Sequence, residues 1–445
     1  MRLHISGLQG SAAALLLAGL PEYGTTTLFI ANDPEEAGYL YNDFMQIRND
    51  NRVLFFPSGY KRALKYGQTD PAADILRTDT INRLQQADES LIVVTYPEAL
   101  CEKVASKEEL HRNTLRLAKG EKCDLASVAD FLTGYGFERV DYVYEPGQFA
   151  VRGSIVDVYS FSSDLPYRID TFGDEIESIR AFNIDTQLSQ DPVNEIFIIP
   201  DLQAGSTSGI SLLQFIDKNT LLAVKDLAWV LERMHSVATD TISQQLLLTE
   251  EGDLHAKEKL IDTDDFSRYV LDFKRIDYGV KSFRDETGAT LSLNCSPQPI
   301  YHKNFYLVSE SFSSLLQDGY KLYILSDSEK QTQRIANIFE DKGENIPFTP
   351  VSKTLHEGFI DNELHLCFFT DHQLFDRFHK YQLRSDKARS GKLALSLKEL
   401  RQFEVGDYIV HIDHGVGKFG GLFRTELNGS MQEVIKLIYQ NDDIL

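Results

Sequence analysis

Apolar residues in the first 110 positions form short runs that alternate with stretches of mixed polarity. Short apolar runs are typical of buried strands, and apolar residues at helical spacing are typical of helices that cover a sheet. The expected strands are residues 3–5, 26–30, 53–56 and 91–95, and the expected helices are residues 12–18, 33–45 and 74–86. Asp33 and Pro34 mark one helix start, as cap and first helical residue. Such repeated units predict a parallel sheet with helices on its faces.

From about residue 115 to residue 205 the pattern changes to apolar and polar residues that alternate between tight turns. The segments VDYVY, FAVRG, IVDVYSF and YRIDTF describe short antiparallel strands of a compact β-rich unit. On the strand 168–172, Arg168, Asp170 and Phe172 share one face, because successive side chains point to opposite sides of a sheet. The unit is expected to begin with a helix at residues 125–135 whose apolar positions face the sheet; these are Leu125, Val128, Phe131 and Leu132.

After residue 205 the pattern is mainly helical, and a second α/β unit follows from about residue 298 to residue 384. The expected helices are residues 210–216, 227–234, 241–248, 312–317 and 329–342, and the expected strands are residues 282–283, 291–293, 321–325 and 364–369. Trp229 falls on an apolar helix stripe and is expected in the core. Residues 326–328 are expected to cap the following helix. Asp371, His372 and His379 could suggest a metal site, but their spacing favours a structural role.

The last part of the chain begins with a polar segment, residues 385–391, that is typical of a linker between domains. Beyond residue 405 the pattern predicts a small twisted β-barrel. Its expected strands are residues 408–411, 418–424 and 433–439, with a bend at residues 414–417 and a hairpin turn at Asn428-Gly429. The segment from Leu422 to Thr425 is expected to be an edge strand, and sheet edges are natural docking sites.

Length and composition limit the classes of protein to which this chain can belong. A chain of 445 residues suggests three to five domains, and a net charge of −22 repels a polyanion, which argues against the whole chain gripping DNA. The four cysteines have no CxxC spacing, so neither a zinc site nor a disulfide framework is indicated, and they fit a reducing cytoplasm. No apolar run is long enough to cross a membrane, so we expect a soluble protein.

The turn between the first strand and the first helix can be tested as a phosphate-binding loop. Such a loop needs a lysine for the phosphates and a hydroxyl group for magnesium. Gly7, Gly10 and Ser11 are present, but Ala13 and Ala14 stand where the lysine and the hydroxyl residue belong. We therefore expect a degenerate site that holds no cofactor and hydrolyses no nucleotide.

The β-rich unit carries the most specific motif of the chain. The sequence EPGQFAVRGSIVDVYSF, followed by LPYRIDTFGDEIESIRAF, resembles the UvrA-binding domain shared by the UvrB and transcription-repair coupling factor (Mfd) families. The resemblance implies that Arg152, Arg168 and Phe172 contact UvrA. The residues alone leave another interpretation open, in which both arginines only pair with Asp157 or Asp170 and Phe172 is a core residue.

A second resemblance covers the last forty residues or so. The phrase GDYIVHIDHGVGKFGGL is similar to the start of the RNA-polymerase-interacting domain shared by the coupling factors and CarD-type regulators. It implies a Tudor/CarD-like barrel, here incomplete, that binds the polymerase β subunit, with Leu422, Phe423 and Thr425 on the docking strand. His411 and His414 are then strand and turn residues rather than catalytic ones.

The resemblance also implies an α/β multidomain architecture. The expected parts are a discontinuous UvrB-like domain with a degenerate P-loop-like parallel sheet (residues 1–114 and 206–297), the inserted UvrA-binding domain (115–205), a small α/β domain (298–384), a linker (385–401) and a partial polymerase-interacting domain (402–445). UvrB has a longer, tyrosine-rich hairpin where this chain has only residues 57–73, so damage reading is not expected.

Together these features predict a non-catalytic recruitment part of a transcription-coupled nucleotide excision repair factor. The chain is expected to be a cytoplasmic monomer that binds UvrA constitutively and RNA polymerase. By the resemblance, the full protein continues into an ATP- and magnesium-dependent DNA translocase motor, through which most DNA contact is made. Two alternatives stay open: a UvrB-like ATP-dependent DNA-damage enzyme, and a stand-alone CarD-like transcription regulator.

Overall fold

The architecture was analysed in a computed structural model of the chain. It describes residues 2–20, 25–59, 71–86, 89–163, 165–184, 186–200, 209–248, 260–279, 288–381, 406–411, 415–427 and 430–439. The chain divides into two units, residues 1–386 and 387–445, and each is described by itself. Four features expected from the sequence lie wholly or partly outside the described residues. They are the polar linker at 385–391, residues 60–70 of the segment 57–73, the strand expected at 282–283, and His414.

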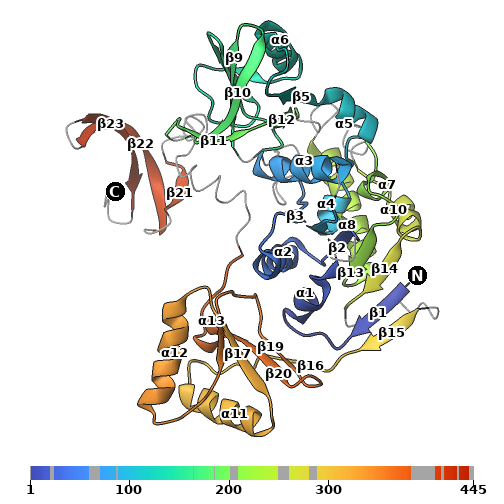
Figure 1. Ribbon diagram of the computed structural model, residues 1–445, viewed down its shortest axis with the longest axis vertical. Helices are drawn as coiled ribbons and strands as arrows, with labels where there is room; N and C mark the ends of the chain where they lie inside the picture. The colour runs from blue at the N-terminus through green and yellow to red at the C-terminus, as the bar shows by residue number, and fades with distance from the viewer. Residues whose placement is uncertain are drawn as a thin grey trace. The chain divides into compact units, whose positions relative to one another are not determined.

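A seven-stranded sheet forms the centre of the first unit, in the order β15-β1-β14-β13-β2-β4-β3. Its strands are β1 (Arg2–Ser6), β2 (Thr27–Ile30), β3 (Val53–Phe55), β4 (Ile92–Thr95), β13 (Leu221–Val224), β14 (Lys274–Asp277) and β15 (Ala289–Ser292). Every pair of neighbouring strands in it is parallel, as the sequence predicts. Blue and green to yellow strands lie side by side in Figure 1, because residues before and after the β-rich unit share this sheet.

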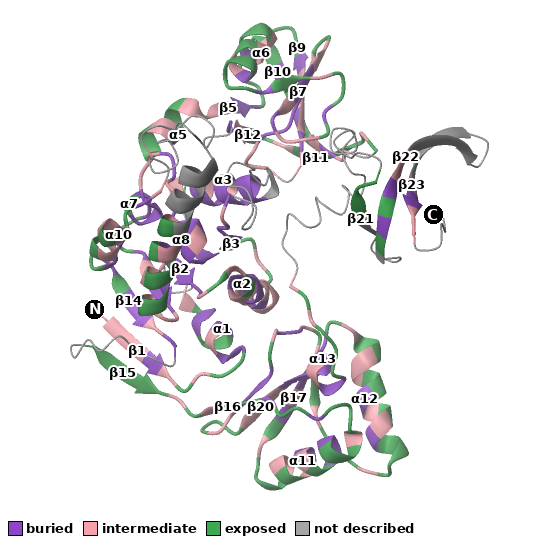
Figure 2. Cartoon of the chain, turned by 180° about the vertical axis from the view of Figure 1, so that it is seen from behind, coloured by how far each residue is buried: buried purple, intermediate pink, exposed green. Residues whose placement is uncertain are grey.

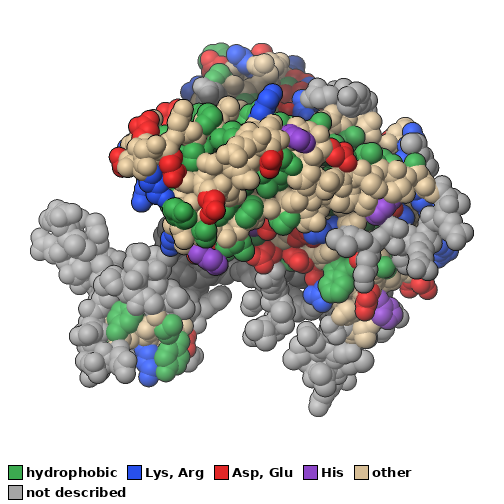
Figure 3. Space-filling model, turned by 90° about the horizontal axis from the view of Figure 1, so that it is seen from below, with side chains coloured by type: hydrophobic (Ala, Val, Ile, Leu, Met, Phe, Trp, Pro, Cys, Tyr) green, Lys and Arg blue, Asp and Glu red, His purple; other side chains and the backbone are tan. Residues whose placement is uncertain are grey.

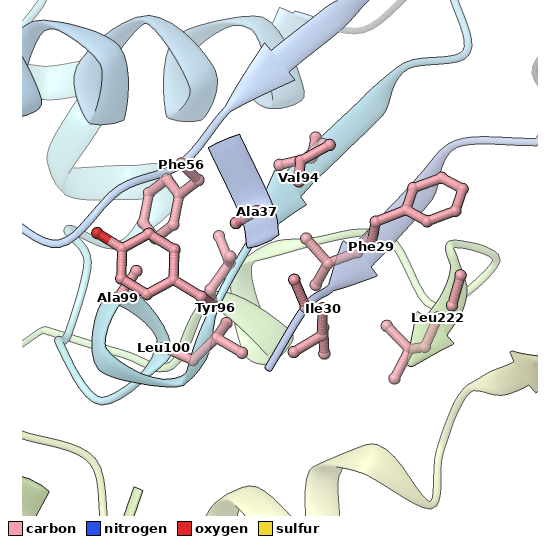
Figure 4. Close-up of a cluster of buried hydrophobic side chains, with 14 of the residues drawn as sticks. Phe29, Ile30, Ala37, Phe56, Val94, Tyr96, Ala99, Leu100 and Leu222 are labelled. Carbon is pink, nitrogen blue, oxygen red and sulfur yellow. The ribbon is translucent and has the colours of Figure 1, made fainter. Parts of the chain in front are cut away.

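Helices pack on this sheet and form a buried apolar cluster together with its strands. They are α1 (Ala12–Leu17), α2 (Pro34–Arg48), α3 (Pro71–Gln86), α4 (Pro97–Leu100), α5 (Lys107–Asn113), α7 (Leu212–Phe215), α8 (Leu227–Leu248) and α10 (Thr263–Val270). The Asp33 carboxylate caps α2 by accepting from the amides of Glu35 and Glu36. Figure 4 shows side chains of β2, β4 and β13 meeting in the buried cluster, among them Phe29, Val94 and Leu222. Strands β2 and β4 are buried, whereas the edge strand β15 and the outer helix faces are exposed (Figure 2).

The sequence predicts mainly helices after residue 205, and this prediction is wrong for β13 and β14, which are strands. The four residues of β13 are all apolar and are separated by two residues from the start of helix α8, so periodicity cannot distinguish them from a helical turn. Strand β14 has the sequence KRID, in which three of four side chains are charged. Only the neighbouring strands β1 and β13 make it a strand, because they supply hydrogen-bonding partners on both sides.

Trp229 is a second correction, since its side chain is 49% exposed rather than buried in the core. Among residues 227–239 of α8, whose burial is described, Val230, Met234 and Val237 are buried, and they follow the helical repeat one position after Trp229. The Trp229 indole Nε1–H donates to the backbone oxygen of Asn32 at 3.2 Å. This hydrogen bond satisfies its polar atom at the surface.

The β-rich unit contains a six-stranded sheet in the order β11-β10-β9-β8-β7-β6 and a separate pair, β5 with β12. Its strands are β5 (Leu115–Ala118), β6 (Glu138–Arg139), β7 (Gln148–Arg152), β8 (Ile155–Val158), β9 (Tyr167–Phe172), β10 (Glu175–Phe182), β11 (Ser189–Val193) and β12 (Glu195–Ile198). Helix α6 (Leu125–Gly134) buries Val128 and Leu132 in the same apolar cluster as Phe149 and Ile169. The expected packing of this helix on the sheet is confirmed.

The second α/β part has a five-stranded sheet in the order β16-β19-β20-β17-β18. Its elements are β16 (Cys295–Pro297), α11 (Phe305–Gln317), β17 (Lys321–Leu325), α12 (Glu329–Asp341), β18 (Thr349–Val351), β19 (Phe359–Asp361), β20 (Leu366–Thr370) and α13 (Asp371–Leu374). Ser328 occupies the cap position of α12, but its side chain makes no capping hydrogen bond, contrary to expectation. Instead the Ser326 hydroxyl donates to Asp371 at 3.0 Å, which joins β17 to α13.

The second unit contains an antiparallel sheet in the order β21-β22-β23. Its strands are β21 (Tyr408–His411), β22 (Gly415–Leu427) and β23 (Ser430–Ile438). Residues 415–417 extend β22 and are not a bend, because Gly415 to Lys418 pair with β21. Strand β22 is therefore the middle strand of the three, although residues 422–425 pair only with β23 among the described residues. Residues 428–429, the expected hairpin turn, lie outside the description.

Cysteines and apolar helices add two observations. All four cysteines are free thiols, with Cys101, Cys123 and Cys367 buried and Cys295 half-buried. Within the described ranges, no helix combines the length and apolarity that crossing a membrane would require.

Candidate partner-binding site

One face of the six-stranded sheet brings the predicted contact residues together. The pleat of β9 turns Ile169 and Thr171 into the interior, where both are buried, and turns Arg168 and Phe172 to the opposite face. Asp157 of β8 is directly opposite Arg168 in the antiparallel register. Side chains of directly opposed residues lie on the same face of a sheet. The register therefore places a carboxylate beside the arginine.

Asp157 links the two predicted arginines. Its side chain is fully buried, and its Oδ1 accepts from Arg168 Nε at 2.8 Å while its Oδ2 accepts from Arg168 Nη2 at 2.9 Å. Arg152 Nη2 also donates to Oδ2 of Asp157. The hydrogen bond to Asp157 raises the pKa of Arg168 above its ordinary value. The pairing that the residues alone suggested is thus present for both arginines.

Aromatic rings and backbone oxygens hold the same two side chains. The Arg168 guanidinium lies 4.6 Å from the centre of the Phe182 ring, and that of Arg152 lies 5.2 Å from the centre of the Tyr142 ring. Arg152 Nη1 donates to the backbone oxygen of Asp141, and Arg168 Nη1 donates to that of Gln187, each at 3.2 Å. Both side chains nevertheless stay partly open to solvent, at 37% for Arg152 and 21% for Arg168.

Phe172 is not a core residue. Its ring is 82% exposed at the end of β9, immediately before Gly173, whose φ of +67° turns the chain toward β10. An exposed phenyl ring on the same face of the sheet as two fixed arginines has the composition of an interface hot spot. The contact role itself stays a prediction, but the core alternative for Phe172 is wrong.

Two residues on this face were not singled out from the sequence. Arg180 of β10 is directly opposite Arg168 and is exposed, with its Nη2 donating to the Ser178 hydroxyl at 3.0 Å. Tyr142, under the Arg152 guanidinium, is 54% exposed. The alternation in EIESIRAF could have indicated Arg180, but a register shift between Ile176 and Ser178 breaks the simple period of two.

The glycine loop of the degenerate nucleotide site is occupied by the chain itself. The Ser11 amide donates to the Glu357 oxygen at 3.1 Å, and the Glu357 amide donates to the Ser11 hydroxyl at 3.0 Å. A Cβ atom on Gly10 would lie 2.8 Å from the backbone oxygen of Gly358. Ala13, at the lysine position, is half-buried and Ala14 is buried. The loop thus binds the segment before β19 through the amide and the hydroxyl group of Ser11.

Buried titratable side chains surround this contact. Asp43 accepts from the His356 amide at 2.7 Å, and burial raises the pKa of Asp43 to about 7. The Tyr39 ring stacks on His356 with 3.5 Å between ring centres. Burial lowers the pKa of His356 to about 4, so the imidazole is neutral at neutral pH.

Asp371, His372 and His379 are engaged in structural contacts. Asp371 pairs with Arg377 at 2.5 Å, a His372 nitrogen lies 2.9 Å from the His356 backbone oxygen, and the His372 and His379 rings stack. Throughout the described parts of the chain, no group of three or more His, Cys, Asp or Glu side chains has an arrangement that could hold a metal ion.

The residues predicted to bind the polymerase all lie on β22. Leu422, Phe423 and Thr425 pair with Ile435, Val434 and Gln432 of β23.

Charged side chains of both signs are scattered over the face drawn in Figure 3, and its described residues form no continuous basic patch. This distribution agrees with the net charge of −22.

Comparison with known domain families gives matches in two parts of the chain. Residues 115–203 match the family model of the UvrB interaction domain, and residues 403–445 match that of the CarD-like/TRCF RID domain. The chain therefore combines two kinds of interaction domain, and the first of them contains the face described above.

Curated relatives are similar to nearly the whole chain. It is 24% identical to the transcription-repair-coupling factor of Bacillus subtilis (strain 168), 22% to that of Staphylococcus aureus (strain USA300) and 23% to that of Staphylococcus epidermidis (strain ATCC 12228 / FDA PCI 1200). Each match covers 99% of this chain and 44% of the relative. The resemblance to transcription-repair-coupling factors seen in the sequence is thereby confirmed, and the chain spans less than half the length of these relatives.

Proposed function

We propose that the chain is a recruitment module of transcription-coupled nucleotide excision repair, which binds UvrA through the β-rich unit and the RNA polymerase β subunit through the C-terminal sheet. The two family matches and the names of the relatives support a repair-coupling role. The observation that carries the UvrA part is that Phe172, with an exposed ring, lies on the same face of the sheet as Arg152 and Arg168, which are both paired with Asp157.

The physical case for this face rests on exposure and rigidity. Phe172 exposes most of its ring to water, and burying a phenyl ring in a partner contributes about 2 kcal/mol. Arginines that are already fixed lose little side-chain entropy when they bind. Aromatic and arginine side chains are also the types that dominate protein interfaces.

Nucleotide chemistry has no place in this proposal. Ala13 replaces the phosphate-binding lysine, and the Ser11 amide already donates to Glu357. The proposal assigns ATP- and magnesium-dependent DNA translocation, and most DNA contact, to the part of the longer relatives that this chain does not cover. It also keeps the expected division into domains, with the UvrA-binding domain inserted in the first α/β domain.

The experiment is a calorimetric titration of the chain with UvrA. We expect Phe172→Ala to weaken binding by about 2 kcal/mol or more, because it removes the exposed anchor. The matched control is Tyr306→Ala, which removes an aromatic ring that is 67% exposed on α11, away from this face. Equal affinity of wild type and Phe172→Ala, or no binding by the wild type, would contradict the UvrA assignment.

A further inference from the structure

We propose that Asp157 is a positioning residue of the UvrA-binding face, which fixes Arg152 and Arg168 in the orientation that the partner meets. This inference rests on the proposed function and deepens it. Asp157 itself cannot contact a partner, because its side chain is fully buried. Any effect it has on binding must pass through the residues that it holds.

The geometry shows that Asp157 serves both arginines at once. One carboxylate oxygen accepts from Arg168 Nε, and the other accepts from Arg168 Nη2 and from Arg152 Nη2. The fork of Arg168 is the bidentate arrangement that fixes a guanidinium in one plane. Arg152 and Arg168 come from strands β7 and β9, on either side of β8, which carries Asp157. The carboxylate is thus the common point of a three-strand cluster.

Charge explains why this point must be a carboxylate. Two guanidinium groups that share one neighbour repel each other, and the repulsion is strongest where water is excluded. A negative charge between them removes the repulsion and satisfies donors that would otherwise be buried. Without it, we expect the two side chains to move apart toward solvent and to occupy several rotamers.

The cluster also indicates the chemistry of the partner surface. Asp157, Asp141 and Gln187 take only part of the donor capacity of the two guanidiniums, and the remaining N–H groups belong to side chains that are partly exposed. These donors match carboxylate or backbone oxygens held in a fixed plane. Phe172 requires an apolar recess close by. A surface of UvrA that offers acceptors around an apolar recess would fit.

The decisive variant is Asp157→Asn, tested in the full chain by titration with UvrA. It keeps the size of the side chain but removes the charge, and we expect binding about tenfold weaker because two long side chains must then be ordered on binding. If simple attraction to an acidic partner governed the site, the added positive charge would tighten binding instead. Tighter or unchanged binding would overturn the proposal.

Asp170→Asn is the matched control. Asp170 lies on the same face of β9, and its carboxylate accepts from the Ser154 hydroxyl at 3.3 Å rather than from either arginine. The substitution makes the same change of charge and size as Asp157→Asn. Because it leaves both arginines paired with Asp157, we expect a smaller loss of UvrA affinity. An equal loss from both variants would mean that net charge, not positioning, matters.

A double-mutant cycle separates positioning from a general structural role. In a chain that already carries Arg152→Ala and Arg168→Ala, Asp157→Asn should weaken UvrA binding no further, because the side chains through which it acts are gone. An undiminished tenfold loss in that background would overturn the proposal. A wild-type chain that fails to bind UvrA would instead refute the proposed function.

A second variant keeps the test valid if Asp157→Asn unfolds the β-rich unit. Arg152→Lys with Arg168→Lys retains both charges and leaves Asp157 in place, but a lysine cannot form the fork with the carboxylate. We expect this pair to lose about tenfold or more in affinity although the charge is unchanged. Wild-type affinity in the double lysine variant would overturn the role of the fixed geometry.

Discussion

Asp43 makes the contact between helix α2 and the segment before β19 depend on pH. Its pKa is about 7 in the folded chain, above its ordinary value of 3.8, because burial disfavours the carboxylate. The stability that it contributes is therefore complete below about pH 4 and is lost as the pH rises through 7. Between these values the loss is on the order of 4 kcal/mol.

Asp43→Asn tests this dependence, because the amide keeps an acceptor for the His356 amide but cannot ionise. We expect the thermal stability of the variant, relative to that of the wild type, to increase as the pH rises from 5 to 8. Hydrogen exchange of the His356 amide reports the contact directly. The exposed Asp318→Asn is the control and should show no such trend. Parallel pH profiles of wild type and Asp43→Asn would refute the argument.

The stability contributed by His356 depends on pH in the opposite direction. It predicts the pH dependence of stability that should remain in the Asp43→Asn variant. Its pKa is lowered to about 4, so its contribution is present above the ordinary value of 6.5 and is lost as the pH falls toward 4. Asp43→Asn should therefore retain a decrease in stability on the acidic side.

Single residues also show what the sequence could predict of the candidate site. Alternation placed Arg168 and Phe172 on one face, and the structure agrees. Periodicity alone could not tell that Phe172 is exposed, since most phenylalanines are buried. The pairing with Asp157 was one of two options, because the register between β8 and β9 follows from the turns and not from composition.

Among the elements, the loop between β1 and α1 makes a contact that its sequence does not reveal. Gly7 and Gly10 both have positive φ, a conformation that side chains other than glycine rarely adopt. The pattern of glycines predicts a degenerate phosphate loop, but the contact with Glu357 and Gly358 joins residues more than 340 positions apart. No local pattern contains that information.

Gly10→Ala should destabilise this contact without changing the face proposed to bind UvrA. The new Cβ would meet the Gly358 oxygen at 2.8 Å, and φ is +51°, so we expect a loss of about 1–3 kcal/mol in the free energy of unfolding. Gly19→Ala is the control, because no atom lies within 4 Å of its added Cβ. Thermal unfolding measures both. A Gly10→Ala chain as stable as Gly19→Ala would contradict the tight fit.

Elements with a complete local signal were predicted well, and those shaped by neighbours were not. Helix α2 has its cap, its proline and an apolar face in the sequence, whereas β14 has none of the usual features of a strand. Strand β22 begins at Gly415 because β21 pairs with it there, although Gly415 and Gly417 suggest a bend. Pairing between strands can outweigh local propensity in this way.

For the whole molecule, the division into two units suggests that the two proposed partners bind independently. The face proposed to bind UvrA lies in the unit of residues 1–386, and the strand proposed for the polymerase lies in the unit of residues 387–445. Sites that share no residues and no core contribute additively to binding energies. Each function should then survive the loss of the other.

A chain that ends at residue 400 should therefore bind UvrA within about twofold of the full chain, and should lose binding to the RNA polymerase β subunit. The reciprocal variant is the full chain with Phe172→Ala, which should keep polymerase binding and lose UvrA. Titration of both chains with both partners gives the four affinities that are needed. If removing the last 45 residues abolishes UvrA binding while the β-rich unit stays folded by circular dichroism, the UvrA site extends beyond the face of β7 to β10. Retained polymerase binding by the shortened chain would instead place that partner on the first unit, and the role proposed for Leu422, Phe423 and Thr425 would be wrong.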